Sequence, residues 1–371
     1  MARSATLWLT QPSRYAAIPR NRARLVLALL AALLLASMTA PWSSAPPAST
    51  PEASRSGDDR RDVLLYESIV AGIRHGGQYY AVAAQELRQG NYPLRPFITF
   101  RLPTLAVVQA QLPPIALPIS LYLLAASTAL AWFARFAELL RGWRARVIGL
   151  ALLAGGLAVF VQGDLWPFHE VWAGLLVALS LARRKPGRWI DAAAIGLVAA
   201  LVRETAAIYL ILMAAWAWRD GARREALGWV LALALFGVAL GFHAAAVARV
   251  VTPLDTVSPG WSGLLGFGFF VNSIAATTAL MIMPGWLQAV LVALALFGWT
   301  ALRDPLGARA ASLFFAFALL LALFARADTF YWAMVVAPPF LVGLAFVPDA
   351  ARELVASALD RRRLRVQIVS R

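Results

Sequence analysis

Apolar residues along this chain gather in long, almost uncharged runs that are separated by short polar stretches. Runs of this length predict membrane-spanning helices, and the lack of strict alternation argues against membrane-spanning strands. We therefore expect an all-α, polytopic integral membrane protein with about ten transmembrane helices. The expected spans lie at 25–40, 114–134, 147–162, 167–182, 189–202, 205–218, 226–247, 281–301, 309–325 and 329–347.

Basic residues divide the chain and give it an orientation. A basic segment at 1–24 precedes a single transmembrane domain at 25–349, and a basic tail at 350–371 follows it. Most of the 34 Lys and Arg residues fall in loops assigned to the inner side, in line with the positive-inside rule. Pro41, just after the first run, disfavours cleavage as a signal peptide, so we expect an uncleaved first helix. Both termini are then expected on the cytoplasmic side of a bacterial inner (plasma) membrane.

The first outer loop, at 42–113, is the longest polar stretch inside the expected membrane domain. Its beginning, 42–60, has the composition of a flexible linker. Helical spacing then predicts helices at 62–74 and 79–89, each followed by glycine. Both are amphipathic rather than uniformly apolar, so we expect this periplasmic loop to carry surface helices that lie on the membrane.

Two places allow more than one topology. The runs at 189–202 and 205–218 are short for a hydrocarbon core of about 30 Å, and they can instead form one long helix that buries Arg203 and Glu204. The stretch at 255–280 is rich in Gly and fits either a surface helix or a re-entrant hairpin. Non-helical backbone at that depth is tolerated only where it lines a cavity.

Composition narrows the function classes. The 371 residues are 61% hydrophobic and 14% charged, and the net charge is +15. Because the arginines cluster in short loops, this charge indicates contact with anionic lipid and not with nucleic acid. The absence of Cys excludes disulfides and thiolate chemistry. The three His residues lack zinc-site spacing, so no metal-ligating residue is predicted, although a divalent cation held through water by outer acids stays open.

Most ionisable residues that do not anchor the inner face fall on the outer side, near helix ends. Charges close to hydrocarbon usually face a bundle interior or a watery cavity, so their convergence predicts one cavity that opens outward. Asp62 is the candidate general base, because a carboxylate can take the proton of an acceptor hydroxyl. Tyr66, one helical turn later, would line the same pocket. The alternative for Asp62 is an ordinary acidic residue in the first turn of a surface helix.

Other polar residues are candidates for binding substrate. Arg203 suits a lipid phosphate because a guanidinium matches two phosphate oxygens; the alternative is an internal ion pair with Glu204. His169 and Glu170 would contact a diphosphate or a sugar, and the alternative is a solvated acid in an interfacial Trp belt. The full set of candidates is Tyr66, His75, Tyr80, Arg95, Asp164, His169, Glu170, Arg203, Glu204, Arg326 and Asp328.

Missing motifs also restrict the chemistry. The sequence has no Walker A motif, no G-x-S-x-G and no Rossmann fingerprint. No inner loop is long enough for a nucleotide-binding domain. A sugar that is already attached to a lipid phosphate fits better, because such a donor can be used on the outer face without nucleotide.

A family pattern runs through the first outer loop. Its residues are, in order, Asp62, Tyr66, Gly76, Gly77, Tyr79 and Tyr80, and then the Tyr-Pro-Leu-Arg-Pro-Phe stretch at 92–97. In this pattern the chain resembles the GT-C glycosyltransferases, and most closely glycosyltransferase family 87, the polyprenol-phosphate-mannose-dependent α-mannosyltransferases. The motif match covers roughly 58–118, and Gly76-Gly77 stands where other GT-C branches carry an acidic pair. The resemblance implies a GT-C fold, a polyprenyl-phosphate-sugar donor, inversion at the anomeric carbon and Asp62 as the catalytic carboxylate.

The expected function is therefore a membrane glycosyltransferase that moves a sugar, mannose by the resemblance, to a glycan or lipid acceptor on the periplasmic face. Asp62 would be the base, and Arg203 or Arg326 would hold the donor phosphate. The expected partners are the polyprenyl-phosphate-sugar donor, the acceptor and membrane lipids, without nucleic acid. Two alternatives stay open: a transporter or flippase of lipid-linked glycans, which would show inverted repeats, and a non-catalytic subunit of a polysaccharide assembly complex.

Overall fold

The computed structural model describes residues 6–43 and 57–360, and this part of the chain contains helices and no β-strand. The expected linker thus falls largely at 44–56, outside the described residues, as does most of the basic tail, at 361–371. The α-helices are α1 (Arg20–Ser37), α2 (Gly57–Arg74), α3 (Tyr79–Gln89), α4 (Thr104–Gln111), α5 (Ala116–Leu139), α6 (Gly142–Leu157), α7 (His169–Arg183), α8 (Ile190–Val202), α9 (Ala207–Arg219), α10 (Arg223–Val247), α11 (Gly266–Ala276), α12 (Gly285–Ala301), α13 (Pro305–Phe324), α14 (Ala337–Phe340) and α15 (Val347–Leu359). The 3-10 helices are η1 (Arg14–Ala17), η2 (Ala40–Trp42), η3 (Phe97–Thr99), η4 (Gly163–Leu165), η5 (Glu204–Ala206), η6 (Ala279–Ile282), η7 (Ala327–Val335) and η8 (Leu341–Phe346).

Several of these helices are long and apolar enough to cross a membrane. Four pass on length and composition: Arg20–Trp42, Ala116–Leu139, Arg223–Val247 and Pro305–Phe324. A fifth is obtained if the segments on either side of the bend after η7 count as one span. The all-helical, membrane-type fold is therefore confirmed at this level, and the finer count of ten spans is not.

The remaining expected spans form helices that are shorter than a bilayer core requires. At 1.5 Å per residue, a span of about 30 Å needs about 20 residues. The helices α6, α7, α8, α9 and α12 have 16, 15, 13, 13 and 17 residues. The runs at 189–202 and 205–218 form two helices, α8 and α9, with a break at Arg203, and not one long helix.

The last expected span, at 329–347, is not a continuous helix. The chain bends by 69° between η7 and the helical stretch that runs from Ala337 to Leu359. Pro338 and Pro339 follow the bend, and proline removes the backbone donors that would continue a regular ladder. In the stretch expected to be a surface helix or a re-entrant hairpin, α11 is buried in the bundle, with Phe269 and Phe270 inaccessible to solvent, which does not fit a surface helix.

Exposed apolar faces support a lipid-facing exterior. The longest helix, α10, leaves Leu231, Leu235 and Phe242 exposed along one side. Its opposite side buries Trp229 and Phe236 in the bundle. A helix with apolar residues on both faces is expected where one face meets protein and the other meets lipid tails.

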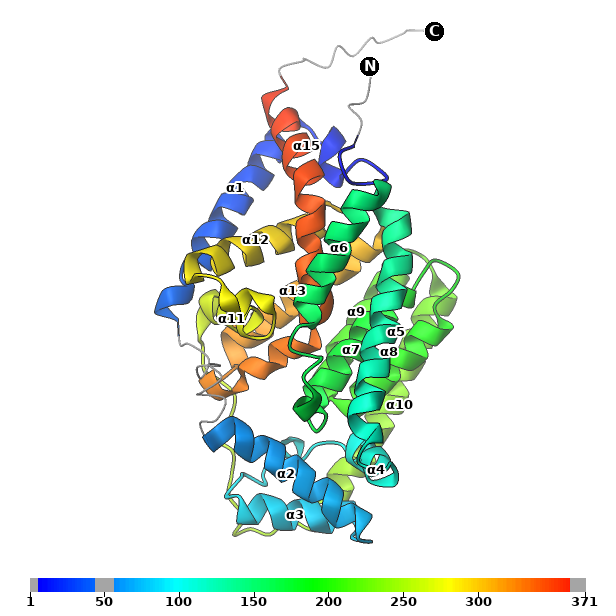
Figure 1. Ribbon diagram of the computed structural model, residues 1–371, viewed down its shortest axis with the longest axis vertical. Coiled ribbons are helices and arrows are strands. Elements are labelled where there is room, and N and C mark those ends of the chain that lie inside the picture. The colour runs from blue at the N-terminus through cyan, green and yellow to red at the C-terminus, as the bar shows by residue number, and fades with distance from the viewer. Residues whose placement is uncertain (1–5, 44–56, 361–371) are drawn as a thin grey trace.

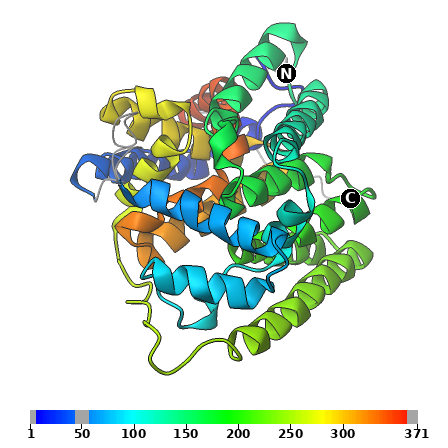
Figure 2. The same cartoon turned by 60° about the horizontal axis from the view of Figure 1, so that its bottom comes forward.

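Three helices of the polar stretch expected at 42–113 lie across one end of the bundle, at the bottom of Figure 1 and brought forward in Figure 2. We call the segment 57–112, with α2, α3 and α4, the helical cap. The cap has an apolar core of its own, to which Ile69 of α2 and Leu87 of α3 contribute, and α2 packs against both α3 and α4. The two helices expected at 62–74 and 79–89 are α2 and α3, and α2 begins earlier, at Gly57.

A glycine turn folds α3 back along α2. Gly76 adopts a φ of +91°, a conformation that residues with a Cβ rarely reach. Its N–H donates to the Ile73 carbonyl at 2.9 Å, and the Gly77 N–H donates to the Gly72 carbonyl at 3.0 Å. This pair of bonds is a Schellman motif, which ends α2 and leads directly into α3.

The opposite end of the bundle holds both ends of the described chain. The backbone N–H groups of Leu7, Trp8 and Leu9 all donate to the Asp349 carboxylate of α15, at 2.6, 2.7 and 2.8 Å. The N-terminal segment is therefore fastened beside α15, far from the helical cap (Figure 1).

Candidate functional site

Four ionisable side chains meet at the junction between the helical cap and the bundle. We call Arg101, Glu170, Arg203 and Glu204 the four-charge cluster. Arg203 Nε lies 2.6 Å from Glu170 Oε1, and Arg203 also forms an ion pair with Glu204. Arg101 approaches Glu170 Oε1 at 3.4 Å and Glu204 Oε1 at 3.7 Å. All four are largely buried, so their two positive and two negative charges balance in a medium of low polarity.

The local sequence explains why these groups converge. Helix α8 ends at Val202, Arg203 takes an extended conformation, and Glu204 begins the 3-10 turn that leads into α9. The break therefore places two charged side chains between two short apolar helices. Glu170 stands in the first turn of α7, where the positive end of the helix dipole favours a carboxylate.

Arg101 reaches the cluster from the cap side. It lies between η3 and α4, and its carbonyl oxygen accepts a hydrogen bond of 2.6 Å from the Tyr79 hydroxyl. Its Nε donates to the Tyr66 hydroxyl oxygen at 3.1 Å. Two tyrosines of the cap thus hold the backbone and the guanidinium of Arg101 in place.

Tyr66 forms one wall of the site. Its ring lies 5.0 Å from the His169 ring and 6.1 Å from the Phe168 ring, measured between centroids. Burial raises the pKa of Tyr66 well above its ordinary value, with Arg101 opposing the shift, so the phenol is neutral near pH 7. Because its oxygen accepts from Arg101, its O–H proton is directed to another acceptor.

Asp62 lies on the same face of α2 as Tyr66, one turn earlier. Its Oδ1 accepts a hydrogen bond of 2.6 Å from the Tyr92 hydroxyl. Burial and this carboxylate raise the pKa of Tyr92, which therefore keeps its proton. Asp62 is half-buried, and its charge contributes to the raised pKa of Tyr66 and of Tyr331 in η7.

Some buried polar atoms near the cluster have no protein partner. Within 6–43 and 57–360, neither ring nitrogen of His169 forms a hydrogen bond, nor do Glu204 Oε2 and Thr205 Oγ1. Buried polar atoms are normally paired, because an unpaired one costs about 1–3 kcal/mol. These atoms are therefore available to a ligand that binds at the junction.

Six of the expected site residues thus gather at one junction: Asp62, Tyr66, His169, Glu170, Arg203 and Glu204. Others lie elsewhere. His75 is exposed beyond the end of α2, and Asp164 is exposed in η4. Arg326 and Asp328 pair with each other at 2.8 Å at the start of η7.

The two remaining candidates tie the cap to α10 and the loop after it. The Tyr80 hydroxyl lies 3.2 Å from His243 Nδ1 on α10. Arg95 donates twice to the Asp255 carbonyl, at 3.0 and 2.7 Å. Arg88 adds a two-point ion pair with the Asp255 carboxylate, both bonds at 2.7 Å. These contacts position the cap and lie outside the four-charge cluster.

Sequence reasoning missed Arg101, Tyr92 and Tyr331. Arg101 stands alone between an aromatic stretch and a Leu-Pro pair, and nothing local separates it from a lipid-anchoring arginine. Tyr92 belongs to the family pattern at 92–97, which was the available signal for it. Tyr331 lies in η7, which packs against α7 and η5, and nothing in the local sequence indicates this packing.

The junction combines three carboxylates with two guanidiniums and several neutral donors. Such a set can take a proton at Asp62 and offer guanidinium N–H donors to a phosphate at Arg101 or Arg203. In the described part of the chain no three His, Asp or Glu residues stand close enough together to hold a metal ion. Comparison with protein-family models, with curated proteins and with solved structures finds no match to this chain.

Proposed function

We propose that this protein is a membrane glycosyltransferase of GT-C type that moves a sugar from a polyprenyl monophosphate to a glycan or lipid acceptor on the outer face. Mannose is the sugar we would test first. One observation carries the proposal: Arg101 and Arg203 both approach the Glu170 carboxylate at the junction under the helical cap, and Arg101 also donates to Tyr66, one turn after Asp62 on α2. That combination supplies a base for the acceptor and cations for the leaving phosphate.

The proposed reaction is a single inverting displacement. The Asp62 carboxylate takes the proton of the acceptor hydroxyl, and the acceptor oxygen attacks the anomeric carbon. The bond between that carbon and the phosphate oxygen breaks, and polyprenyl phosphate leaves with the electron pair. No covalent enzyme intermediate forms, so one carboxylate is sufficient. Tyr92 orients the Asp62 carboxylate through its hydrogen bond.

In this proposal the arginines hold the donor phosphate before and after the bond breaks. Guanidiniums bind phosphate oxygens in pairs, and they stabilise the charge that develops on the leaving group. Glu170 and Glu204 keep the two cations buried and preoriented while the site is free of donor. The neutral Tyr66 phenol would donate a hydrogen bond to the same phosphate and keep its proton.

A ten-span topology with both termini in the cytoplasm belongs to the same proposal. The short helices would span the membrane where polar groups at both ends of the bundle make the hydrocarbon core of the bilayer locally thinner. The chain has no Cys, so single cysteines can be labelled without background. With a membrane-impermeant thiol reagent, Asp164→Cys should react from the periplasm, and Arg188→Cys should react only after the membrane is opened. The reverse pattern would contradict the topology.

A carrier of lipid-linked glycans is the second candidate, and broken helices favour it. The interruption between α8 and α9 at Arg203 and the 69° bend after η7 are features that transporters place at substrate sites. A carrier would move its substrate across the bilayer and leave it chemically unchanged. Product analysis therefore separates the two functions.

The test uses the full chain in liposomes with radiolabelled polyprenyl-phosphate-mannose and a panel of glycan and lipid acceptors. We expect labelled product and released polyprenyl phosphate, and a loss of about 100-fold or more in rate for Asp62→Asn. Asp164→Asn, which removes an exposed carboxylate of the same outer side, should leave the rate unchanged. Equal turnover by Asp62→Asn and the native protein would refute the role of Asp62, and translocation without turnover would favour a carrier.

A further inference from the structure

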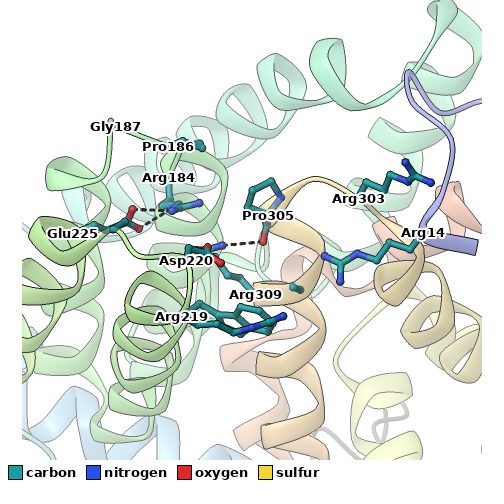
Figure 3. Close-up of a pocket in the computed structure, with 13 residues that line it drawn as sticks. Arg14, Arg184, Pro186, Gly187, Arg219, Asp220, Glu225, Arg303, Pro305 and Arg309 are labelled. Carbon is teal, nitrogen blue, oxygen red and sulfur yellow. Dashed lines mark hydrogen bonds and ion pairs between the residues drawn. The ribbon is translucent and has the colours of Figure 1, made fainter. Parts of the chain in front are cut away.

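A second polar site lies at the end of the bundle opposite the helical cap. It is a cavity of 420 Å³ lined by η1, the ends of α7 and α9, the start of α10 and the turn into α13 (Figure 3). Helix α7 separates it from the four-charge cluster, because Glu170 lies in the first turn of that helix and Arg184 follows its end. At 1.5 Å per residue, the 15 residues of α7 span about 20 Å. This cavity is therefore not part of the proposed transfer site.

Arginine dominates the lining of the cavity. Five arginines face it against two acidic residues: Arg14, Arg184, Arg219, Arg303 and Arg309, with Asp220 and Glu225. Figure 3 shows that they come from segments far apart in the chain. The volume falls within the range of about 300–1,000 Å³ that is usual for small-ligand pockets.

Two of the arginines are neutralised by the two acids. Arg184 donates from Nε and Nη2 to the two oxygens of Glu225, both at 2.7 Å, and both side chains are buried. Arg309 donates to Asp220 at 2.7 Å. The carboxylates are thus already occupied, and they do not offset the other three cations.

Arg14, Arg219 and Arg303 have no carboxylate partner within the described residues. Arg14 uses its Nε on the Leu302 carbonyl at 2.8 Å, and Arg303 uses its Nε on the Ser13 carbonyl at 2.9 Å. Each therefore keeps its terminal nitrogens for another acceptor. Arg219 stacks on the ring of Trp216, 4.4 Å from the centroid, which fixes the plane of its guanidinium.

Gathering these cations has an electrostatic cost. Burial lowers the pKa of Arg14, Tyr15 opposes the shift, and repulsion from Arg219 and Arg303 lowers the pKa further. Arg309 is buried, and its Nε has no hydrogen-bond partner in the protein. A bound anion would relieve the repulsion and offer an acceptor to the remaining donors.

Topology alone does not explain this arrangement. The positive-inside rule requires basic residues on the inner face, but any position in the loops satisfies it. Arg144 and Arg224 illustrate that reading, because both are exposed and neither lines the cavity. The five lining arginines instead border one concave space from separate elements.

We propose that this cavity binds a phosphate-bearing anion on the inner side of the membrane, through Arg14, Arg219 and Arg303. The phosphate is either the headgroup of an anionic lipid or a free phosphate. The inference goes beyond the proposed transferase function and does not depend on it. Three cations with free terminal N–H groups match the acceptor oxygens of phosphate in number and in charge.

The test measures binding to the purified full chain after removal of bound lipid in an uncharged detergent. Native mass spectrometry follows short-chain phosphatidylglycerol, with zwitterionic phosphatidylcholine, which has no net charge, as the comparison, and calorimetry follows inorganic phosphate and pyrophosphate. The variant is Arg219→Gln with Arg303→Gln, and the matched control is Arg144→Gln with Arg224→Gln. Arg219→Lys with Arg303→Lys keeps the charge and reports on folding.

We expect the glutamine pair at 219 and 303 to weaken anion binding by about tenfold for each arginine removed. The control pair should bind as the native protein does, and the lysine pair should keep most of the affinity. Arginine-dependent binding of phosphatidylglycerol identifies a lipid headgroup as the ligand, and arginine-dependent binding of phosphate or pyrophosphate identifies a free anion. Equal binding by the native protein and the 219/303 variant, or an equal loss in the control, would overturn the proposal.

Discussion

Glu170 and Arg203 form an ion pair of 2.6 Å with both side chains almost completely buried, at 1% and 2% exposure. The two residues belong to α7 and to the break between α8 and α9, so the pair fastens the bundle at the place where the helical cap covers it. A buried pair of this kind contributes little net stability against an apolar alternative, but it is costly to split. The ion pair matters for function because it lies at the same junction as Asp62, the candidate base.

Splitting the Glu170–Arg203 pair should therefore destabilise the fold. Glu170→Gln leaves Arg203 with one charged partner fewer in a buried site, and we expect the free energy of unfolding to fall by about 3–5 kcal/mol. Unfolding in detergent, followed by tryptophan fluorescence, measures the change. The exposed pair Arg183–Asp191 is the control, and Asp191→Asn should cost less than about 1 kcal/mol. Similar losses in both variants would contradict the buried role.

Tyr66→Phe should change the dependence of stability on pH. Burial raises the folded-state pKa of Tyr66 above its ordinary value near 10, so above that pH the unfolded chain releases a proton that the fold retains. The contribution of Tyr66 is thus fully present below about pH 10 and declines as the pH rises further. The stability difference between native protein and variant should be constant from pH 7 to 9 and shrink above pH 10. A difference that varies between pH 6 and 8 would contradict this assignment.

The Arg88–Asp255 pair should hold the cap to the loop after α10 over a wide pH range. Hydrogen bonds from Arg88 and from the Thr252 backbone keep the pKa of Asp255 well below its usual value of 3.8. A lowered folded-state pKa means that the contribution is present above about pH 4 and is lost as the pH falls through the lowered value. Asp255→Asn should therefore speed hydrogen exchange in α3 at every pH from 8 to 4.

The control for the cap is Asp328→Asn, because Asp328 pairs with Arg326 outside the cap. Exchange in α3 should not change in that variant. If Asp255→Asn left the exchange of α3 as slow as in the native protein, the ion pair would not be what secures the cap.

Close backbone contact predicts a strong effect at Gly298. A Cβ at this position of α12 would overlap the carbonyl oxygen of Gly343 in η8, and small residues of this kind let membrane helices approach closely. Gly298→Ala should lower the free energy of unfolding by about 1–3 kcal/mol through overpacking. Gly237→Ala on α10 is the control, since nothing lies within 4 Å of its added Cβ. Equal stability of the two variants would show that η8 can move away.

The pattern of long apolar runs was enough to predict an all-helical fold of membrane type and the approximate positions of α5, α10 and α13 along the chain. The sequence also predicted α2 and α3 in the polar stretch at 42–113, because amphipathic spacing and the glycines after each helix are local signals. The break at Arg203 was visible as a pair of charges between two short runs. That Glu170 lies opposite Arg203 was not visible, since it depends on how α7 packs against α8.

The bend inside the last expected span has a physical cause that can be read in part from the sequence. Pro338-Pro339 inside an apolar run indicates a bend, but run length alone treated the segment as one helix. Arg101 could not be singled out at all, because its role comes from contacts with Tyr66, Tyr79 and Glu170 that are distant in sequence. Charges that converge only through tertiary packing have no periodic signal in the chain.

The most direct measurement is a structure of the full chain in a lipid nanodisc with bound polyprenyl-phosphate-mannose. We expect the donor phosphate within hydrogen-bonding distance of the Arg101 or Arg203 guanidinium, and the sugar beside the Asp62 carboxylate beneath α2. A donor bound elsewhere, with Asp62 directed into solvent and the four-charge cluster unchanged, would contradict a transfer site at this junction.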